Sequence, residues 1–383
     1  MNKLKVLSVN ISEKKGTIKL PVPSITLTEN GVEGDAHSGP WNRQVSMLGI
    51  GSIRKSEMEA GRKINYGEFA ENITTEGIDL WKCHPLDRFV SEEVELEVTQ
   101  IGKECHGTSC SIFKEVGNCV MPKEGIFARV ITPGALGSRF KVQGSSTEDQ
   151  ESSIQHPASS IQHPGSRIQH PASSIQHPAS LTAGISLDYV PKVYSARIIT
   201  LSDRAFKGEY EDKSGPRVKE LLEDFFNSHE NTKTQKHPDS ESRSLDPRPS
   251  TLDPSPHVSR LTSHVVLLPD DPDQLRSALQ EAIDADIDFI FTTGGTGIGH
   301  RDFTPDVVKP MFDKEIPGIM EMIRIKYGAE KHQALLSRGV AGVTGNTLIF
   351  TLPGSVKAVN EYMQEIGKSL MHMVYMLNGL DAH

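Results

Sequence analysis

The stretch DFIFTTGGTGIGHRDFTPD, residues 288–306, decides the fold of the C-terminal half of the chain. It begins with an apolar run of strand length, continues through a loop rich in glycine and threonine, and ends at Pro305 ahead of further apolar residues. Proline is tolerated in the first turn of a helix, so the order is strand, polar loop, helix. Such a unit indicates an α/β domain rather than an all-helical or all-β one.

The same pattern recurs on both sides of this stretch. Three further apolar runs alternate with helical periodicity, namely VYSARIITL (193–201), SHVVLLPDD (263–271) and NTLIFTLPGS (346–355). Strands that are apolar nearly end to end are typical of a parallel sheet covered on both faces. We therefore expect an α/β domain with a mostly parallel sheet.

Polar motifs follow all four apolar runs. They are Ser202-Asp203-Arg204, Pro269-Asp270-Asp271, Gly294-Gly295-Thr296-Gly297 and Leu352-Pro353-Gly354-Ser355. In an open α/β sheet the carboxyl ends of the strands line one crevice, where ligands bind. Any one of these motifs could simply be a turn, but together they predict a common site.

The residue types in this site indicate phosphate chemistry. Glycines let backbone N–H groups approach an anion, and the hydroxyl of Thr296 can donate to phosphate. Asp270 and Asp302 would repel phosphate, but they suit a Mg²⁺ ion that bridges to it. The loop matches neither GxxxxGK[ST] nor GxGxxG, so the residues alone predict a Mg²⁺-assisted phosphate or nucleotide site.

TTGGTG with RDFTPD, together with SDR, LPD and LSRGVAGVTGNTLIFTLPGS, resembles the MogA/MoaB family of molybdenum-cofactor proteins. The resemblance implies an adenylyltransferase, in which the terminal phosphate of molybdopterin attacks the α-phosphate of MgATP. It also implies a homotrimer. The alternative is a domain that binds molybdopterin as a scaffold and does no chemistry.

Carried over by motif, the resemblance assigns roles to individual residues. Phosphate would be held by Gly294, Gly295, Thr296 and Gly297. Catalysis and Mg²⁺ binding would fall to Asp270 and Asp302. The pterin and nucleotide pockets would be lined by Asp203, Ser337, Asn346, Thr347 and Ser355.

The N-terminal half has short alternating runs, such as VELEVTQI at 94–101, that predict a mainly β domain. Through VEGDAH, RQVSML, ENITTEGIDL and the cysteine stretch ending in GIFARV it resembles the MOSC domain. The resemblance implies a β-barrel that binds molybdenum cofactor and carries sulfur on a cysteine. Cys110 is the first candidate for that catalytic role, followed by Cys119 and Cys105.

Other readings of the four cysteines stay open. A structural zinc site would use Cys105, His106, Cys110 and Cys119, although their spacing is not a usual pairing of zinc ligands. A structural metal-binding N-terminal module therefore remains an alternative to sulfur transfer. For Cys83 we expect a buried, inert thiol.

Two polar segments divide the chain. Residues 143–190 contain four SSIQHPA-like units, in which proline excludes a continuous helix, so we expect a flexible linker. The regular histidines of the repeat could alternatively bind a metal loosely. Residues 228–262 are expected to be a disordered insertion. The domains are then a MOSC domain at 1–142 and a MogA/MoaB-like domain at 191–383.

Composition mostly excludes other classes of protein. The chain has 383 residues and a net charge of −9, without a basic stretch suited to nucleic acid. No apolar window is long enough to span a bilayer, so we expect a soluble, cytoplasmic protein. The expected partners are molybdopterin, ATP, a sulfur donor and a protein that inserts molybdate.

Overall fold

The computed structural model describes residues 3–103, 119–137, 185–233 and 259–380. They form two compact units, one of residues 1–81 with 89–189 and one of residues 82–88 with 190–383. Cys105, His106 and Cys110 lie outside the described residues, as do the SSIQHPA repeats.

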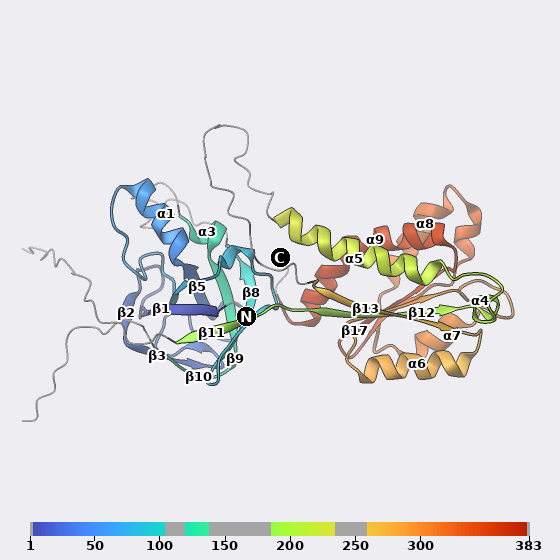
Figure 1. The fold of residues 1–383 in the computed structure, drawn as a ribbon, viewed down its shortest axis with the longest axis horizontal. Helices are drawn as coiled ribbons and strands as arrows, with labels where there is room; N and C mark the ends of the chain where they lie inside the picture. The colour runs from blue at the N-terminus through green and yellow to red at the C-terminus, as the bar shows by residue number, and fades with distance from the viewer. Residues whose placement is uncertain (1–2, 104–118, 138–184, 234–258, 381–383) are drawn as a thin grey trace, which may run out of the picture. The chain divides into compact units, whose positions relative to one another are not determined.

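The first unit is a closed β-barrel (Figure 1). Seven of its described strands close in the order β11-β7-β8-β9-β5-β6-β1, and β1 pairs back onto β11. β2 extends the sheet beside β1, while β10, β3 and β4 form a separate small sheet. The strands are β1 (Lys3–Ile11), β2 (Leu20–Val22), β3 (Ser24–Thr28), β4 (Gly31–Val32), β5 (Val45–Gly49), β6 (Ile73–Glu76), β7 (Arg88–Val90), β8 (Glu95–Ile101), β9 (Ile126–Thr132), β10 (Gly134–Gly137) and β11 (Ser186–Val190). The predicted mainly β class is confirmed.

Short helices accompany the barrel strands. They are α1 (Ile50–Ala60), η1 (Leu80–Lys82) and α3 (Met121–Glu124). The sequence did not indicate α1, because two of its three buried residues are Ser52 and Ser56 rather than apolar side chains. Its third buried residue, Ile53, packs in a cluster with Leu48 and Phe127.

The barrel also corrects the expected end of the linker. Residues 186–190 were placed in the 143–190 linker, but they form β11, which pairs antiparallel with β1. Leu187 is fully buried and its neighbours are only partly buried, which gives the strand its alternation. The pairing with β1 therefore makes these residues a strand that completes the barrel.

The second unit contains a six-stranded sheet in the order β13-β12-β14-β17-β16-β15. The first four strands are parallel to one another, and β16 and β15 are antiparallel additions. They are β12 (Tyr194–Leu201), β13 (Leu261–Leu268), β14 (Phe289–Thr293), β15 (Lys314–Glu315), β16 (Ala341–Thr344) and β17 (Thr347–Leu352). This confirms the predicted mostly parallel α/β sheet.

Helices cover both faces of this sheet (Figure 1). One face packs on α5 (Ser214–Lys233), α8 (Pro317–Gly328) and α9 (Val356–Leu377), through a core that includes Val218, Met320 and Ile366. The other packs on α6 (Pro272–Asp284) and α7 (Thr304–Val308), through Leu279 and Val307. The smaller helices are α4 (Asp203–Phe206), η3 (Lys309–Met311) and η4 (His332–Leu336).

The predicted insertion at 228–262 is too wide at both ends. Helix α5 continues to Lys233, and β13 already begins at Leu261. Leu261 is 6% exposed and pairs with Tyr194 at the start of β12, so the core of the unit requires it. In the described part of the chain, no helix combines the length and apolarity needed to cross a bilayer.

Candidate functional site

The glycine loop leaves the carboxyl end of β14, as predicted. Gly294 has a φ of +98°, a conformation that favours glycine, and a side chain there would lie 2.5 Å from the carbonyl oxygen of Leu201 on β12. Its N–H donates to the carbonyl of Leu352 at the end of β17, at 3.0 Å. The loop is therefore tied to both neighbouring strand ends.

Arg338 braces this loop from the other side. Its Nε donates to the carbonyl of Gly297 at 2.8 Å, and its Nη2 also donates to the carbonyl of Asp302. Its two Nη atoms pair with the carboxylate of Asp306, both at 2.9 Å. Hydrogen bonding to Arg338 holds the pKa of Asp306 below its usual range. One guanidinium thus fixes the shape of residues 297–306.

Asp302 closes the loop against its own backbone. Its Oδ2 accepts from the N–H of Gly299 at 2.7 Å. A side chain at Gly297 would lie 2.7 Å from the same oxygen, so only glycine leaves this approach open. The carboxylate lies in the wall of a cavity of 460 Å³, which we call the glycine-loop pocket.

The glycine-loop pocket is formed by the loop, the η4 region and the first turns of α9. Two tyrosines and several small or apolar side chains line it beside charged groups. Its lining residues are Gly295, Thr296, Gly297, Asp302, Tyr327, Lys331, Gln333, Ala334, Leu336, Ser337, Pro353, Gly354, Ser355, Lys357, Ala358, Glu361 and Tyr362. Aromatic rings together with charged and hydroxyl groups suit a flat heterocycle that carries phosphate.

Hydroxyl groups order the wall of this pocket. Tyr362 donates from its hydroxyl to the Oγ of Ser337 at 2.8 Å, and burial raises the pKa of Tyr362. Ser355 caps α9, because its Oγ accepts from the N–H of Ala358 at 3.3 Å. Ser337 and Ser355 thus both line this pocket.

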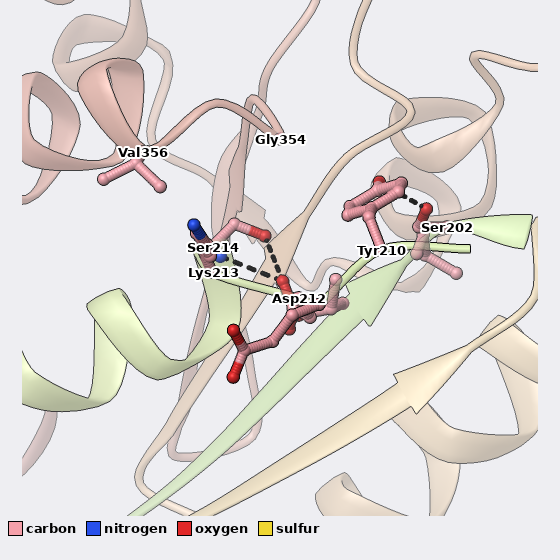
Figure 2. A pocket seen from close by; sticks show the side chains of 10 residues that line it. Ser202, Tyr210, Asp212, Lys213, Ser214, Gly354 and Val356 are labelled. Atoms are coloured by element: carbon pink, nitrogen blue, oxygen red, sulfur yellow. Dashed lines mark hydrogen bonds between the residues drawn. The ribbon is translucent and has the colours of Figure 1, made fainter. Parts of the chain in front are cut away.

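A second cavity of 410 Å³ lies between the start of α5 and the start of α9 (Figure 2). We call it the hydroxyl pocket, since hydroxyl-bearing side chains provide much of its wall. Its lining residues are Thr200, Leu201, Ser202, Tyr210, Glu211, Asp212, Lys213, Ser214, Gly354 and Val356. Of these, the sequence had indicated Ser202 and Gly354 as parts of strand-end motifs.

Asp212 organises the hydroxyl pocket. Its Oδ2 accepts from the hydroxyl of Thr200 at 2.7 Å, and its Oδ1 accepts from both the N–H and the hydroxyl of Ser214 at 2.9 Å (Figure 2). Ser202 and Tyr210 share a hydrogen bond of 2.7 Å on the opposite side. Gly354 belongs to the walls of both pockets, so the two cavities meet at the start of α9.

Five of the predicted residues that the structure describes line neither pocket, and one of them is Gly294, at the start of the glycine loop. The N–H of Asp270 donates to Oδ1 of Asp203 at 3.0 Å, which joins the ends of β13 and β12. Asn346 and Thr347 lie at the beginning of β17, at the opposite end of that strand from Leu352. The structure thus brings Asp203 and Asp270 together at the predicted edge, but not Asn346 and Thr347.

The metal prediction has limited support from side-chain clustering. Within the described residues, no group of three or more carboxylate, imidazole or thiol side chains gathers to hold an ion. Mg²⁺ commonly takes only one or two carboxylates and fills its other positions with water and substrate phosphates. Asp302, and Asp270 beside Asp203, fit that sparse pattern.

The barrel holds its own buried charges. Lys19 and Asp35 form an ion pair with an N–O distance of 2.5 Å, and each side chain is 1% exposed. Burial would raise the pKa of Asp35, but hydrogen bonds from His37 and Lys19 outweigh it and hold that pKa well below its usual range. Burial also lowers the pKa of Lys19. The buried ammonium of Lys19 and the buried carboxylate of Asp35 therefore neutralise each other.

Glu71 in the ENITTEGIDL segment is fully buried. Its Oε1 accepts from the N–H of Gly67 at 2.7 Å and from the hydroxyl of Thr74 at 2.9 Å, while its Oε2 has no hydrogen-bond partner. Burial raises the pKa of Glu71 to about 7. Cys83 and Cys119 are also buried, at 2% and 8% exposure, in accord with a buried thiol at Cys83.

Several residues of the site had not been singled out in the sequence. Arg338, Lys331, Lys357 and Asp212 become visible only when α5, α8 and α9 are packed together. A local signal did exist for Asp212, because it lies two residues before Ser214, where α5 begins. Asp and Ser at such a position commonly accept hydrogen bonds from the first turn of a helix.

Comparison with known proteins places both units. Residues 260–372 match the model of a probable molybdopterin binding domain, and residues 34–142 match the MOSC domain. A molybdopterin adenylyltransferase of Pyrococcus furiosus is 34% identical over 191 residues, which cover 48% of this chain and 91% of that protein. The chain belongs to the molybdopterin-binding family of molybdenum cofactor biosynthesis proteins.

Two further relatives of this family can be named. Molybdenum cofactor biosynthesis protein B of Staphylococcus carnosus is 43% identical over 117 residues, or 30% of this chain and 69% of that protein. The crystal structure of a molybdopterin biosynthesis protein from Mycobacterium abscessus is 28% identical, covering 49% of this chain and 98% of that one, with a TM-score of 0.38. The matched residues 260–372 include the glycine loop, and the MOSC match, which begins at residue 34, includes Asp35 but not Lys19.

Proposed function

We propose that the molybdopterin-binding domain adenylylates molybdopterin. The terminal phosphate oxygen of molybdopterin attacks the α-phosphorus of ATP, and the bond from that phosphorus to the β-phosphate oxygen breaks. The products are adenylyl-molybdopterin and pyrophosphate. The observation that carries this proposal is the pair of cavities that meet at Gly354, each of a size that suits a small molecule.

The two pockets suggest how two substrates would be arranged. We assign the pterin to the glycine-loop pocket, because Tyr327 and Tyr362 offer aromatic surface there. The nucleoside then belongs to the hydroxyl pocket, where Glu211 and several hydroxyls can accept and donate hydrogen bonds to a ribose. The reacting phosphates would meet near Gly354, within reach of the glycine loop.

The transfer needs positioning and charge stabilisation rather than a covalent nucleophile. Backbone N–H groups of the glycine loop would stabilise phosphate oxygens, and Arg338 would keep that loop in shape. Asp302, and Asp270 with Asp203, would hold Mg²⁺, which supplies neutralisation of the triphosphate charge when bound. The protein would thus act through the geometry of its strand ends.

The test is molybdopterin-dependent release of pyrophosphate from MgATP by the purified protein. The proposal predicts release that saturates with both substrates. A protein that binds molybdopterin tightly but releases no pyrophosphate would instead be a binding scaffold. A variant with Gly294→Val gives the matched control, because its new side chain would collide with β12 and displace the loop.

We further propose that the MOSC barrel acts on the same cofactor and carries sulfur on Cys110. Cys119 is 8% exposed, which disfavours it as an accessible carrier. Incubation with a persulfide donor, which transfers its outer sulfur to the cysteine and leaves as a thiol, followed by mass spectrometry, should show a persulfide in the native protein and in Cys119→Ser, but not in Cys110→Ser. Persulfide retained in Cys110→Ser would move the carrier to another thiol, and one zinc per chain would favour the structural metal site.

A further inference from the structure

Two lysines come together at the rim of the glycine-loop pocket. Lys331 precedes η4, Lys357 is the second residue of α9, and both side chains line the cavity. Each lysine is close enough to influence the pKa of the other, and the two line one cavity together. An ammonium group only donates hydrogen bonds, so two charged lysines in contact repel unless an acceptor lies between them.

The carboxylates around the pair leave one lysine unmatched. Glu361, which also lines the pocket, accepts from Lys331 with an N–O distance of 2.8 Å. Glu330 is close enough to interact electrostatically with both lysines but does not line the cavity. In the described part of the chain, Lys357 forms no ion pair with a carboxylate. The neighbouring Lys331 lowers the pKa of Lys357.

A second lysine cluster further along α9 shows what a satisfied arrangement looks like. Glu365 is 4% exposed and lies between Lys326 and Lys368, with N–O distances of 2.6 Å to both. There the carboxylate separates the two ammonium groups. At the pocket rim, by contrast, the described ion pairs match Glu361 with Lys331 only and give Lys357 no carboxylate partner of its own.

We propose that Lys331 and Lys357 form an anion clamp that binds the phosphate group of the molecule in the glycine-loop pocket. A phosphate dianion offers acceptors to both ammonium groups at once and removes their mutual repulsion. Its carrier would be the phosphomonoester of molybdopterin. That identity rests on the proposed function, whereas the anion binding itself does not.

The clamp can be tested without turnover, by isothermal titration of the full-length protein with inorganic phosphate and with pyrophosphate. Lys357→Met and Lys331→Met should each weaken phosphate binding by about 10-fold or more, the loss typical of one charge-assisted hydrogen bond. Lys357→Arg should retain binding. The control is Lys368→Met, three turns further along the same face of α9, which should stay within about twofold.

Three results would overturn the clamp. They are phosphate affinity that is unchanged in the Lys331→Met/Lys357→Met double variant, an equal loss in Lys368→Met, and no measurable phosphate binding by the native protein. Circular dichroism and melting temperature establish that the variants are folded. Titration with ATP separates the two phosphate sources, because a loss confined to ATP would assign the clamp to the nucleotide and contradict the phosphomonoester.

The phosphate-binding test of the clamp can fail or succeed independently of adenylyl transfer. Phosphate binding that depends on the two lysines supports the clamp even if the protein releases no pyrophosphate from ATP. Adenylyl transfer with lysine-independent phosphate binding would contradict the clamp and leave the transferase standing.

Discussion

The MOSC barrel and the molybdopterin-binding domain place their charged side chains in different surroundings. In the barrel, Lys19 and Asp35 neutralise each other at 2.5 Å and are almost wholly removed from water. In the second domain, Asp302, Lys331 and Lys357 line a cavity instead. A polar group that is already matched by the protein stabilises the fold, whereas one left facing a cavity is available to a ligand.

The largest effect that this contrast predicts is on catalysis. Asp302→Asn should lower kcat for adenylyl transfer by about 10³-fold, in the range found for loss of one preorganised electrostatic group. Its melting temperature and its KM for molybdopterin should change little. Steady-state kinetics with Asp284→Asn, an exposed residue at the end of α6, as the control would check this. Unchanged turnover would remove Asp302 from the catalytic machinery.

In the barrel, removing one partner of the Lys19–Asp35 ion pair should lower stability without lowering the rate of adenylyl transfer. Asp35→Asn leaves the Lys19 ammonium buried without its counter-charge, which should cost about 3 kcal/mol of unfolding free energy. Both tryptophans of the chain, Trp41 and Trp81, belong to the barrel unit, so urea unfolding followed by fluorescence reports on that unit. The exposed Glu33→Gln should change stability by less than about 0.5 kcal/mol. Equal effects of the two substitutions would contradict a structural role for the pair.

Glu71 should make the barrel more stable at lower pH. Its pKa of about 7 lies above the ordinary value of 4.5, so between these values only the unfolded chain releases this proton. The stabilisation is fully present below pH 4.5 and is lost as the pH rises through about 7. Glu71→Gln should therefore be more stable than the native protein at pH 8 by on the order of 2 kcal/mol. Parallel stability curves for the two proteins between pH 5 and pH 8 would refute the buried, neutral carboxyl.

The smallest expected effect is that of the loop brace. Arg338→Lys keeps the charge but cannot make the contacts of Nε and both Nη atoms at once. We expect kcat to fall by about 10-fold while KM for molybdopterin stays within about twofold, because Arg338 positions the loop without touching substrate. Asp306→Asn removes only one of these contacts, so its kcat should lie between that of the native protein and that of Arg338→Lys. A loss confined to KM would place Arg338 in substrate binding instead.

The sequence was most informative where one local pattern determines one structure. Apolar runs ending at Leu201, Thr293 and Leu352 predicted the parallel strands, and the glycines after Thr293 predicted the loop. Helix α1 gave no comparable signal because serines occupy much of its buried side. Strand β11 is defined by its pairing with β1, which lies more than 180 residues earlier in the chain, so its own sequence could not reveal it.

In the candidate site, too, residues of one local motif could be predicted, whereas residues brought together by long-range packing could not. Gly294–Gly297 and Asp302 belong to one continuous motif, so their proximity was readable in advance. Lys331, Lys357 and Asp212 come together with partners through the packing of α5, α8 and α9, which no short spacing encodes. The resemblance assigned Asn346 and Thr347 to the pterin and nucleotide pockets, but the length of β17 separates them from the strand end at Leu352.

The most direct test of the central claim is transfer of label from [α-³²P]ATP to molybdopterin by the purified full-length protein with Mg²⁺. The account predicts labelled adenylyl-molybdopterin in a one-to-one ratio with pyrophosphate, and its near-complete loss in Asp302→Asn. Tight binding of molybdopterin without any label transfer, by protein with an intact fold, would contradict it.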